Sequence, residues 1–159
     1  MRPAIWVLTL LCGTAAATPA TAQKWVVSEE ESVTLEYRNA ADTASILSVS
    51  CHTELSDIVV PINPGTKPPT TPPELKITEK GTTRTMKLTV EVCGGELTCT
   101  DRPNGEVSTY YVRQKQKLLA LRFAEKATAI SIDAPGAAIK ANADKAAFAK
   151  FVSLCKKHK

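Results

Sequence analysis

Cysteine is the residue type in this chain whose chemistry depends most on spacing. Cys93 and Cys99 are six positions apart and flank a Gly-Gly step in VEVCGGELTC, whereas Cys51 and Cys155 each stand far from any other cysteine. A zinc site requires four converging thiolates or imidazoles at short paired spacing, and a redox pair usually has two residues between its cysteines. Neither pattern is present, so we predict disulfides and no bound metal or other cofactor.

The N-terminal segment places these cysteines in an oxidising compartment. A basic residue, a short apolar run and small residues ending at Ala22 have the layout of a secretory signal peptide. We predict cleavage of residues 1–22, leaving a single periplasmic or secreted domain over 23–159 without a transmembrane segment. The absence of an N-x-Ser/Thr acceptor favours a bacterial periplasmic protein. Lipidation at Cys12 is disfavoured, because Leu11 stands where a lipoprotein signal has a small residue.

Four cysteines then allow three pairings, and we favour Cys51 with Cys155 and Cys93 with Cys99. Cys51 lies on the apolar side of the alternating segment 44–51, and Cys155 lies on the apolar stripe of the C-terminal helix. A bond between them would tether that helix to the sheet. Cys93 and Cys99 can meet only across a five-residue loop, since a two-residue turn would put their thiols on opposite faces. The two crossed pairings remain alternatives.

Hydrophobic periodicity predicts an α+β domain, mostly an antiparallel β-sheet or sandwich with a C-terminal helix packed on it. Strands are expected at 25–27, 33–37, 44–51, 75–77, 84–93, 106–112 and 128–135. The segment 84–93 alternates over its whole length and predicts one continuous strand with one buried face.

Two helices are expected in the C-terminal third. Residues 114–127 contain no β-branched residue, which favours helix, although their leucines would also suit a strand. The last helix is expected to be capped by Asn142 and to carry an apolar stripe of Phe148, Phe151, Val152 and Cys155.

Charge is unevenly distributed along the exported chain. Residues 23–112 carry 8 basic and 13 acidic side chains, whereas residues 113–159 carry 11 basic and 3 acidic ones. We expect the lysines to coat the outer face of the C-terminal helix, where they can contact an anionic surface weakly. Because this region lacks interleaved aromatic residues, no nucleic-acid partner is predicted.

Two loops are the predicted interaction sites, because stiff or covalently closed loops lose little entropy when they bind. The stretch PINPGTKPPTTPP, residues 61–73, has six prolines and is expected to be extended and exposed. Its predicted contact residues are Pro61, Pro64, Lys67, Pro69 and Pro73. The second loop, residues 94–98, offers Gly94, Gly95 and Glu96.

Catalytic residues are sparse. His52 is the only histidine inside the predicted fold, and alternation is expected to spread Ser48, Ser50 and Asp57 over both faces of the sheet. The chain contains no G-x-S-x-G elbow and no glycine-rich phosphate loop. No catalytic residue is therefore assigned.

The sequence thus favours a non-enzymatic binding protein that contacts an envelope or extracellular macromolecule through exposed loops. Inhibition of an enzyme is the sharper form of this hypothesis. One alternative is a hydrolase with an unfamiliar site around His52. The other is an envelope-associated protein held by its basic C-terminal helix.

Overall fold

The computed structural model describes residues 23–63, 66–67, 69–92 and 107–158. Several predictions fall outside these residues: the signal peptide, the Cys93–Cys99 bond, Pro64, and the loop with Gly94, Gly95 and Glu96.

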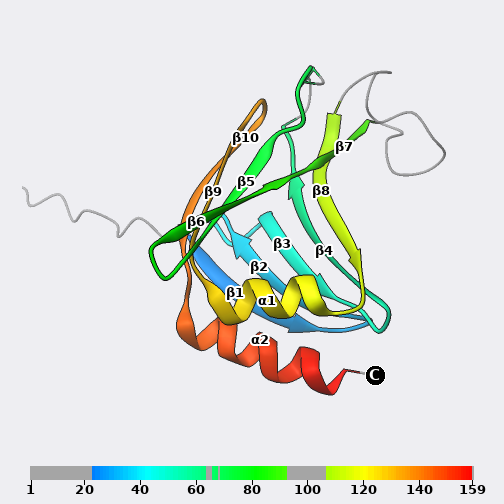
Figure 1. Cartoon of the computed structure of the whole chain (residues 1–159), viewed down its shortest axis with the longest axis vertical. Helices are drawn as coiled ribbons and strands as arrows, with labels where there is room; N and C mark the ends of the chain where they lie inside the picture. Colours follow the sequence, from blue (N-terminus) through cyan, green and yellow to red (C-terminus); the bar gives the residue numbers. More distant parts are fainter. Residues whose placement is uncertain (1–22, 64–65, 68, 93–106, 159) are drawn as a thin grey trace, which may run out of the picture.

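The described chain forms two antiparallel sheets that face each other (Figure 1). The first has the order β1-β2-β3-β4-β8-β7: β1 (Lys24–Glu29), β2 (Val33–Arg38), β3 (Ser45–Cys51), β4 (Leu55–Pro61), β8 (Val107–Lys115) and β7 (Thr89–Val92). The second has the order β10-β9-β5-β6: β10 (Ala137–Asn142), β9 (Ala127–Ala134), β5 (Glu74–Glu79) and β6 (Thr82–Lys87). This arrangement confirms a β-rich, antiparallel class with a C-terminal helix.

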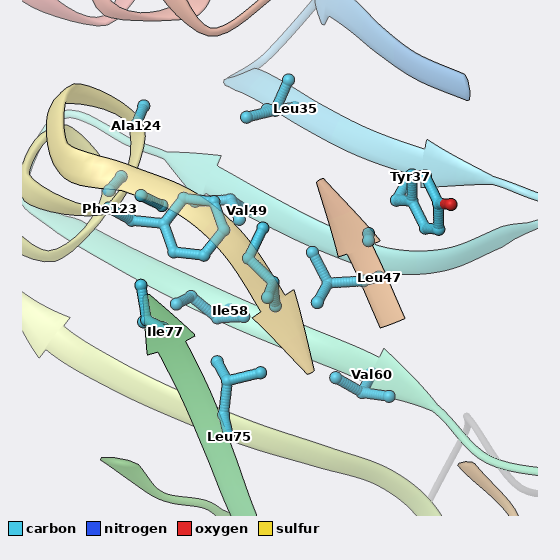
Figure 2. Close-up of a cluster of buried hydrophobic side chains, with 14 of the residues drawn as sticks. Leu35, Tyr37, Leu47, Val49, Ile58, Val60, Leu75, Ile77, Phe123 and Ala124 are labelled. Carbon is cyan, nitrogen blue, oxygen red and sulfur yellow. The ribbon is translucent and has the colours of Figure 1, made fainter. Parts of the chain in front are cut away.

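The core lies between the sheets. Strand β2 shows the pattern most clearly, because Val33, Leu35 and Tyr37 are buried while the residues between them are partly exposed. Side chains from both sheets and from the first helix meet in one apolar cluster (Figure 2): Leu35, Tyr37, Leu47, Val49, Ile58, Val60, Leu75, Ile77, Phe123 and Ala124.

Helices α1 (Leu118–Lys126) and α2 (Lys145–Lys157) lie next to each other at one end of the molecule (Figure 1). The apolar stripe predicted for α2 is confirmed, since Phe148, Phe151 and Cys155 are buried and Val152 is partly buried.

The predicted helix starts need correction. Asn142 does not cap α2, because it is the last residue of β10 and its carbonyl accepts a hydrogen bond from Trp25 Nε1 at 2.7 Å. Asp144 is the cap instead, and its carboxylate accepts from the backbone N–H groups of Ala146 and Ala147. The helix predicted at 114–127 begins only at Leu118, because β8 continues to Lys115.

The disulfide Cys51–Cys155 joins β3 to α2. Both residues are fully buried, and the bond spans a sequence separation of 104. The favoured pairing is thus confirmed for these two cysteines. It is the one disulfide among the described residues, and the second predicted bond remains a prediction.

The prediction of one continuous strand at 84–93 is wrong. The segment divides at Leu88 into β6 and β7, which belong to different sheets although they follow one line across the molecule (Figure 1). Leu88 is buried between them, and its N–H donates to the Pro73 carbonyl at 2.8 Å. The alternation of apolar and polar residues is the same on both sides of Leu88, because an apolar side chain can face the same core from either sheet.

Candidate functional site

The proline-rich segment connects the first sheet to the second, and its described residues are held by hydrogen bonds near both ends. Asn63 N–H donates to the Gly136 carbonyl at 3.1 Å, and the Pro73 carbonyl accepts from Leu88. Pro61 and Lys67 are exposed, Pro69 is partly exposed and Pro73 is buried. A partner could therefore reach the first three side chains, whereas Pro73 belongs to the core side of the connection.

The histidine region differs from expectation. Ser50 lies directly opposite Asp57 in the β3–β4 register, so the two side chains share a face instead of being separated by alternation. The Asp57 carboxylate is 9 % exposed and lies 3.5 Å from an Arg113 nitrogen and 4.0 Å from His52 Nε2. The last distance is too long for a hydrogen bond, and within the described chain no hydrogen bond joins Ser50 to His52. The cluster is thus an ion pair with a neighbouring imidazole, without an activated nucleophile.

A second charged cluster lies where β1 meets the β2–β3 turn. Lys24 Nζ is 2.7 Å from Asp42, and an Arg38 nitrogen is 2.5 Å from Glu36. The hydrogen bond from Lys24 lowers the pKa of the Asp42 carboxyl, and the hydrogen bond to Glu36 raises the pKa of Arg38. These charges satisfy one another, which indicates a surface network and not a binding site.

An open cleft of about 290 Å³ lies between α1 and the β5–β6 hairpin, and we call it the α1 cleft. Its apolar lining is Ile77, Met86, Leu118, Leu119 and Phe123, and its polar lining is Glu79, Arg84, Gln114 and Arg122. Because Ile77 and Phe123 also belong to the core cluster in Figure 2, the cleft leads directly to the interior.

The exposure of Leu118 distinguishes this cleft. Leu118 is 63 % exposed and is the exposed large hydrophobic residue of the described chain. It opens α1 and stands beside a deeper wall formed by Leu119 and Phe123, which are 6 % and 2 % exposed. The cleft therefore has an apolar floor and an apolar lip.

The charges around the α1 cleft favour an anionic group. Arg84 is paired with Glu79 at 3.2 Å, whereas Arg122 makes no ion pair among the described residues. Helix α1 begins at this cleft with Leu118 and Leu119 and has no acidic residue in its first turn, so the positive end of its dipole lies at the cleft, where one backbone N–H, that of Ala120, donates to the Ser56 hydroxyl at 3.4 Å. A carboxylate or phosphate beside an apolar group would find complementary charge here.

Sequence reasoning missed this cleft, although one signal was present. Arg84 occupies the same alternation phase as Met86, so it lies on the inner face of β6 and opposite Ile77 of β5. A basic side chain on the same strand face as buried residues indicates a charged group at the edge of the core. The sequence of α1 contains no comparable signal. Its residues form a cleft wall only because the β5–β6 hairpin lies opposite them, and the position of the hairpin cannot be read from the helix sequence.

Among the described residues, no group of three or more His, Cys, Asp or Glu side chains is arranged to hold a metal ion. Likewise, no helix in the described chain is long and apolar enough to cross a membrane. Comparison with protein families, curated proteins and solved structures finds no match for this chain.

Proposed function

We propose that this chain is an exported, non-enzymatic binding protein that receives an apolar group of a partner macromolecule in the α1 cleft. The observation that carries the proposal is Leu118, a large apolar side chain left 63 % exposed at the mouth of an apolar cleft. Full burial of a leucine side chain stabilises by roughly 1.5–3 kcal/mol, so covering Leu118 offers a partner part of that free energy.

The size of the cleft supports a macromolecular partner. Pockets for drug-sized ligands have volumes of roughly 300–1,000 Å³, and the α1 cleft of about 290 Å³ is at or below that range. It therefore suits a single aromatic or aliphatic side chain, or a short acyl group, presented by a larger molecule. Arg122 favours a partner with a carboxylate or phosphate next to that group.

The rigidity of the walls supports binding as well. Helix α1 is held by four buried residues, Leu119, Ala120, Phe123 and Ala124. The Ser56 hydroxyl donates to the Gln116 carbonyl at 2.9 Å, which fixes the turn leading into the helix. A wall that is already ordered loses little entropy on binding. The buried disulfide is in keeping with an oxidising compartment, which is where the signal peptide would direct the chain.

A photo-cross-linking residue tests the proposal in cells that export the full chain. p-Benzoylphenylalanine at position 118 should give a defined adduct on irradiation. The same residue at position 85, replacing the exposed Thr85 on the outer face of β6, is the matched control. Adducts at 118 that are absent at 85, and that weaken when Arg122→Ala is added, would support the proposal. Adducts that are absent at 118, or identical at both positions, would refute it.

One observation keeps a hydrolase as a second candidate, because the register places Ser50 opposite Asp57, whose carboxylate lies 4.0 Å from His52 Nε2. His52→Ala separates the two functions. Under the binding proposal the cross-linked adduct at position 118 is unchanged in this variant. Hydrolysis of an activated ester such as p-nitrophenyl acetate that disappears in His52→Ala and in Ser50→Ala would favour the hydrolase.

A further inference from the structure

A second hollow lies at the C-terminal end of α1 and is lined by different residues. This groove of about 1,160 Å³ is bounded by the β5–β6 turn, the C-terminal end of α1, and α2. Lys80, Lys126, Lys145 and Lys156 line it, and we call it the lysine groove. It shares only Glu79 with the α1 cleft, so the two sites rest on almost entirely different residues.

The floor of the lysine groove is apolar and made mainly of small side chains. Ala124, Ala127 and Phe148 are buried beneath it, and Val152 is partly buried. Phe148 is held in place by ring contacts, with a centroid distance of 4.9 Å to Trp25 and 5.8 Å to Phe123. Because alanine side chains fill little space, a segment lying in the groove can bring its own apolar side chains down to this floor.

The positive charge of the groove is not neutralised within the described chain. Its two acidic residues are already paired, Glu125 with Lys156 at 2.7 Å and Glu79 with Arg84 at 3.2 Å. Lys80, Lys126 and Lys145 are exposed and make no ion pair among the described residues. Three lysines therefore face the groove with their charge available to a ligand.

The position of Lys80 adds a local observation. Lys80 and Gly81 form the two-residue turn of the β5–β6 hairpin, with φ of 48° and 85°. Such a turn favours Asn, Asp or Gly at its first position, and the left-handed conformation is disfavoured for lysine. The chain thus accepts local strain at the residue that extends one rim of the groove.

We infer that the lysine groove binds an acidic peptide segment of a protein partner, with the carboxylates on the lysine rim and small apolar side chains on the alanine floor. The unpaired lysines are complementary in charge to an acidic partner. The concave shape of the groove fits an extended peptide segment. A flat anionic membrane would contact protruding lysines and leave the floor empty.

The test uses a defined probe and the exported, oxidised protein. The probe is a fluorescein-labelled, acetylated 12-residue peptide of alternating Glu and Ala with one central Leu, and binding is followed by fluorescence anisotropy. Lys126→Glu/Lys145→Glu should weaken binding at least tenfold. Lys87→Glu/Lys115→Glu is the matched control, because it makes the same change in net charge at exposed positions outside the groove. This control should weaken binding less than threefold.

Three outcomes would overturn the inference. Equal loss in both double variants would mean that long-range charge, and not the groove, attracts the peptide. Groove-dependent binding to phosphatidylglycerol vesicles without peptide binding would identify an anionic surface instead. Concentration-dependent self-association that is lost in Lys126→Glu/Lys145→Glu, again without peptide binding, would identify a second copy as the occupant. Equal melting temperatures show that the variants are folded. If Lys126→Glu/Lys145→Glu does not fold, Lys126→Ala/Lys145→Ala is used in its place. The adduct at position 118 tests the α1 cleft separately.

Discussion

Removal of the Cys51–Cys155 bond is the perturbation whose magnitude the structure defines best. The bond closes a loop of 104 residues, which in the chain-entropy description stabilises by about 4.7 kcal/mol. A domain of about 137 residues, the length predicted after signal-peptide cleavage, unfolds with an entropy of roughly 0.29 kcal/mol per kelvin, so the Cys51→Ala/Cys155→Ala variant should melt about 16 °C lower. Because both residues are fully buried, the wild-type bond should also resist reductant until the protein unfolds.

Thermal and urea unfolding of the two proteins, followed by circular dichroism, measure this effect. If the bond acts by restraining the unfolded chain, the double variant should have a lower urea midpoint and a larger m-value, since its unfolded state is more expanded. Cys93→Ala/Cys99→Ala is the matched comparison. Its predicted bond closes a much shorter loop, so its loss should lower the melting temperature about half as much. A decrease below about 5 °C in the Cys51→Ala/Cys155→Ala variant, with an unchanged m-value, would refute the reasoning.

Two further predictions concern backbone conformation and pH. Gly136 and Gly81 both have positive φ, but a Cβ at Gly136 would collide with Thr66 and Ile62 whereas one at Gly81 would meet nothing within 4 Å. Gly136→Ala should therefore lower the free energy of unfolding by more than about 2 kcal/mol and Gly81→Ala by about 1 kcal/mol, and equal values from urea denaturation would contradict the close packing of Ile62 and Thr66 against the β9–β10 turn. Burial raises the pKa of Tyr110, whose hydroxyl donates to the Pro135 carbonyl at 2.7 Å. The folded state then holds this proton where the unfolded state releases it, so stability should decrease as pH rises above about 10. Tyr110→Phe should reduce that pH dependence and cost about 1 kcal/mol at neutral pH, and an absorbance titration at 295 nm in which the ionisation missing from Tyr110→Phe lies near the ordinary tyrosine value of about 10 would contradict the assignment.

The periodicity of apolar residues predicted those strands and helices that have one buried face and one solvent-exposed face. Strand β2 and helix α2 meet this condition, and their buried residues were identified by period alone. The Cys51–Cys155 bond followed from the same argument, because each cysteine is in phase with the apolar residues of its element.

Strand β4 was missed because it breaks that condition. It lies between β3 and β8, and Ser56, Asp57 and Ile58 are buried one after another. Burial of Ser56 is compensated by its hydrogen bond to Gln116, and burial of Asp57 by Arg113. A central strand with satisfied polar side chains does not alternate, so period 2 cannot reveal it.

Strand β10 and the division at Leu88 escaped prediction for a different reason. Strand β10 has one large apolar residue, Ile139, among alanines and polar residues, and it is paired through the turn at Gly136. Leu88 marks a change of sheet, which is a property of pairing partners and not of the segment itself. The α1 cleft and the lysine groove could not be predicted for the same reason. Each is formed by the β5–β6 hairpin and helix α1, which are far apart in the sequence and come together only in the folded chain.

The two helices connect these surfaces to the disulfide. Lys117, directly before α1, donates to the carbonyls of Cys155 and His158 at the C-terminal end of α2, where a cation is favoured by the helix dipole. Cys155 is at the same time bonded to β3, so one end of α2 is fixed to both α1 and the sheet. Loss of the disulfide should therefore loosen α2, which forms a wall of the lysine groove, more than it loosens the α1 cleft, to which α2 contributes no residue. Binding of an acidic peptide should thus be weaker in Cys51→Ala/Cys155→Ala below its melting temperature, whereas the adduct at position 118 should form in this variant as it does in the wild type.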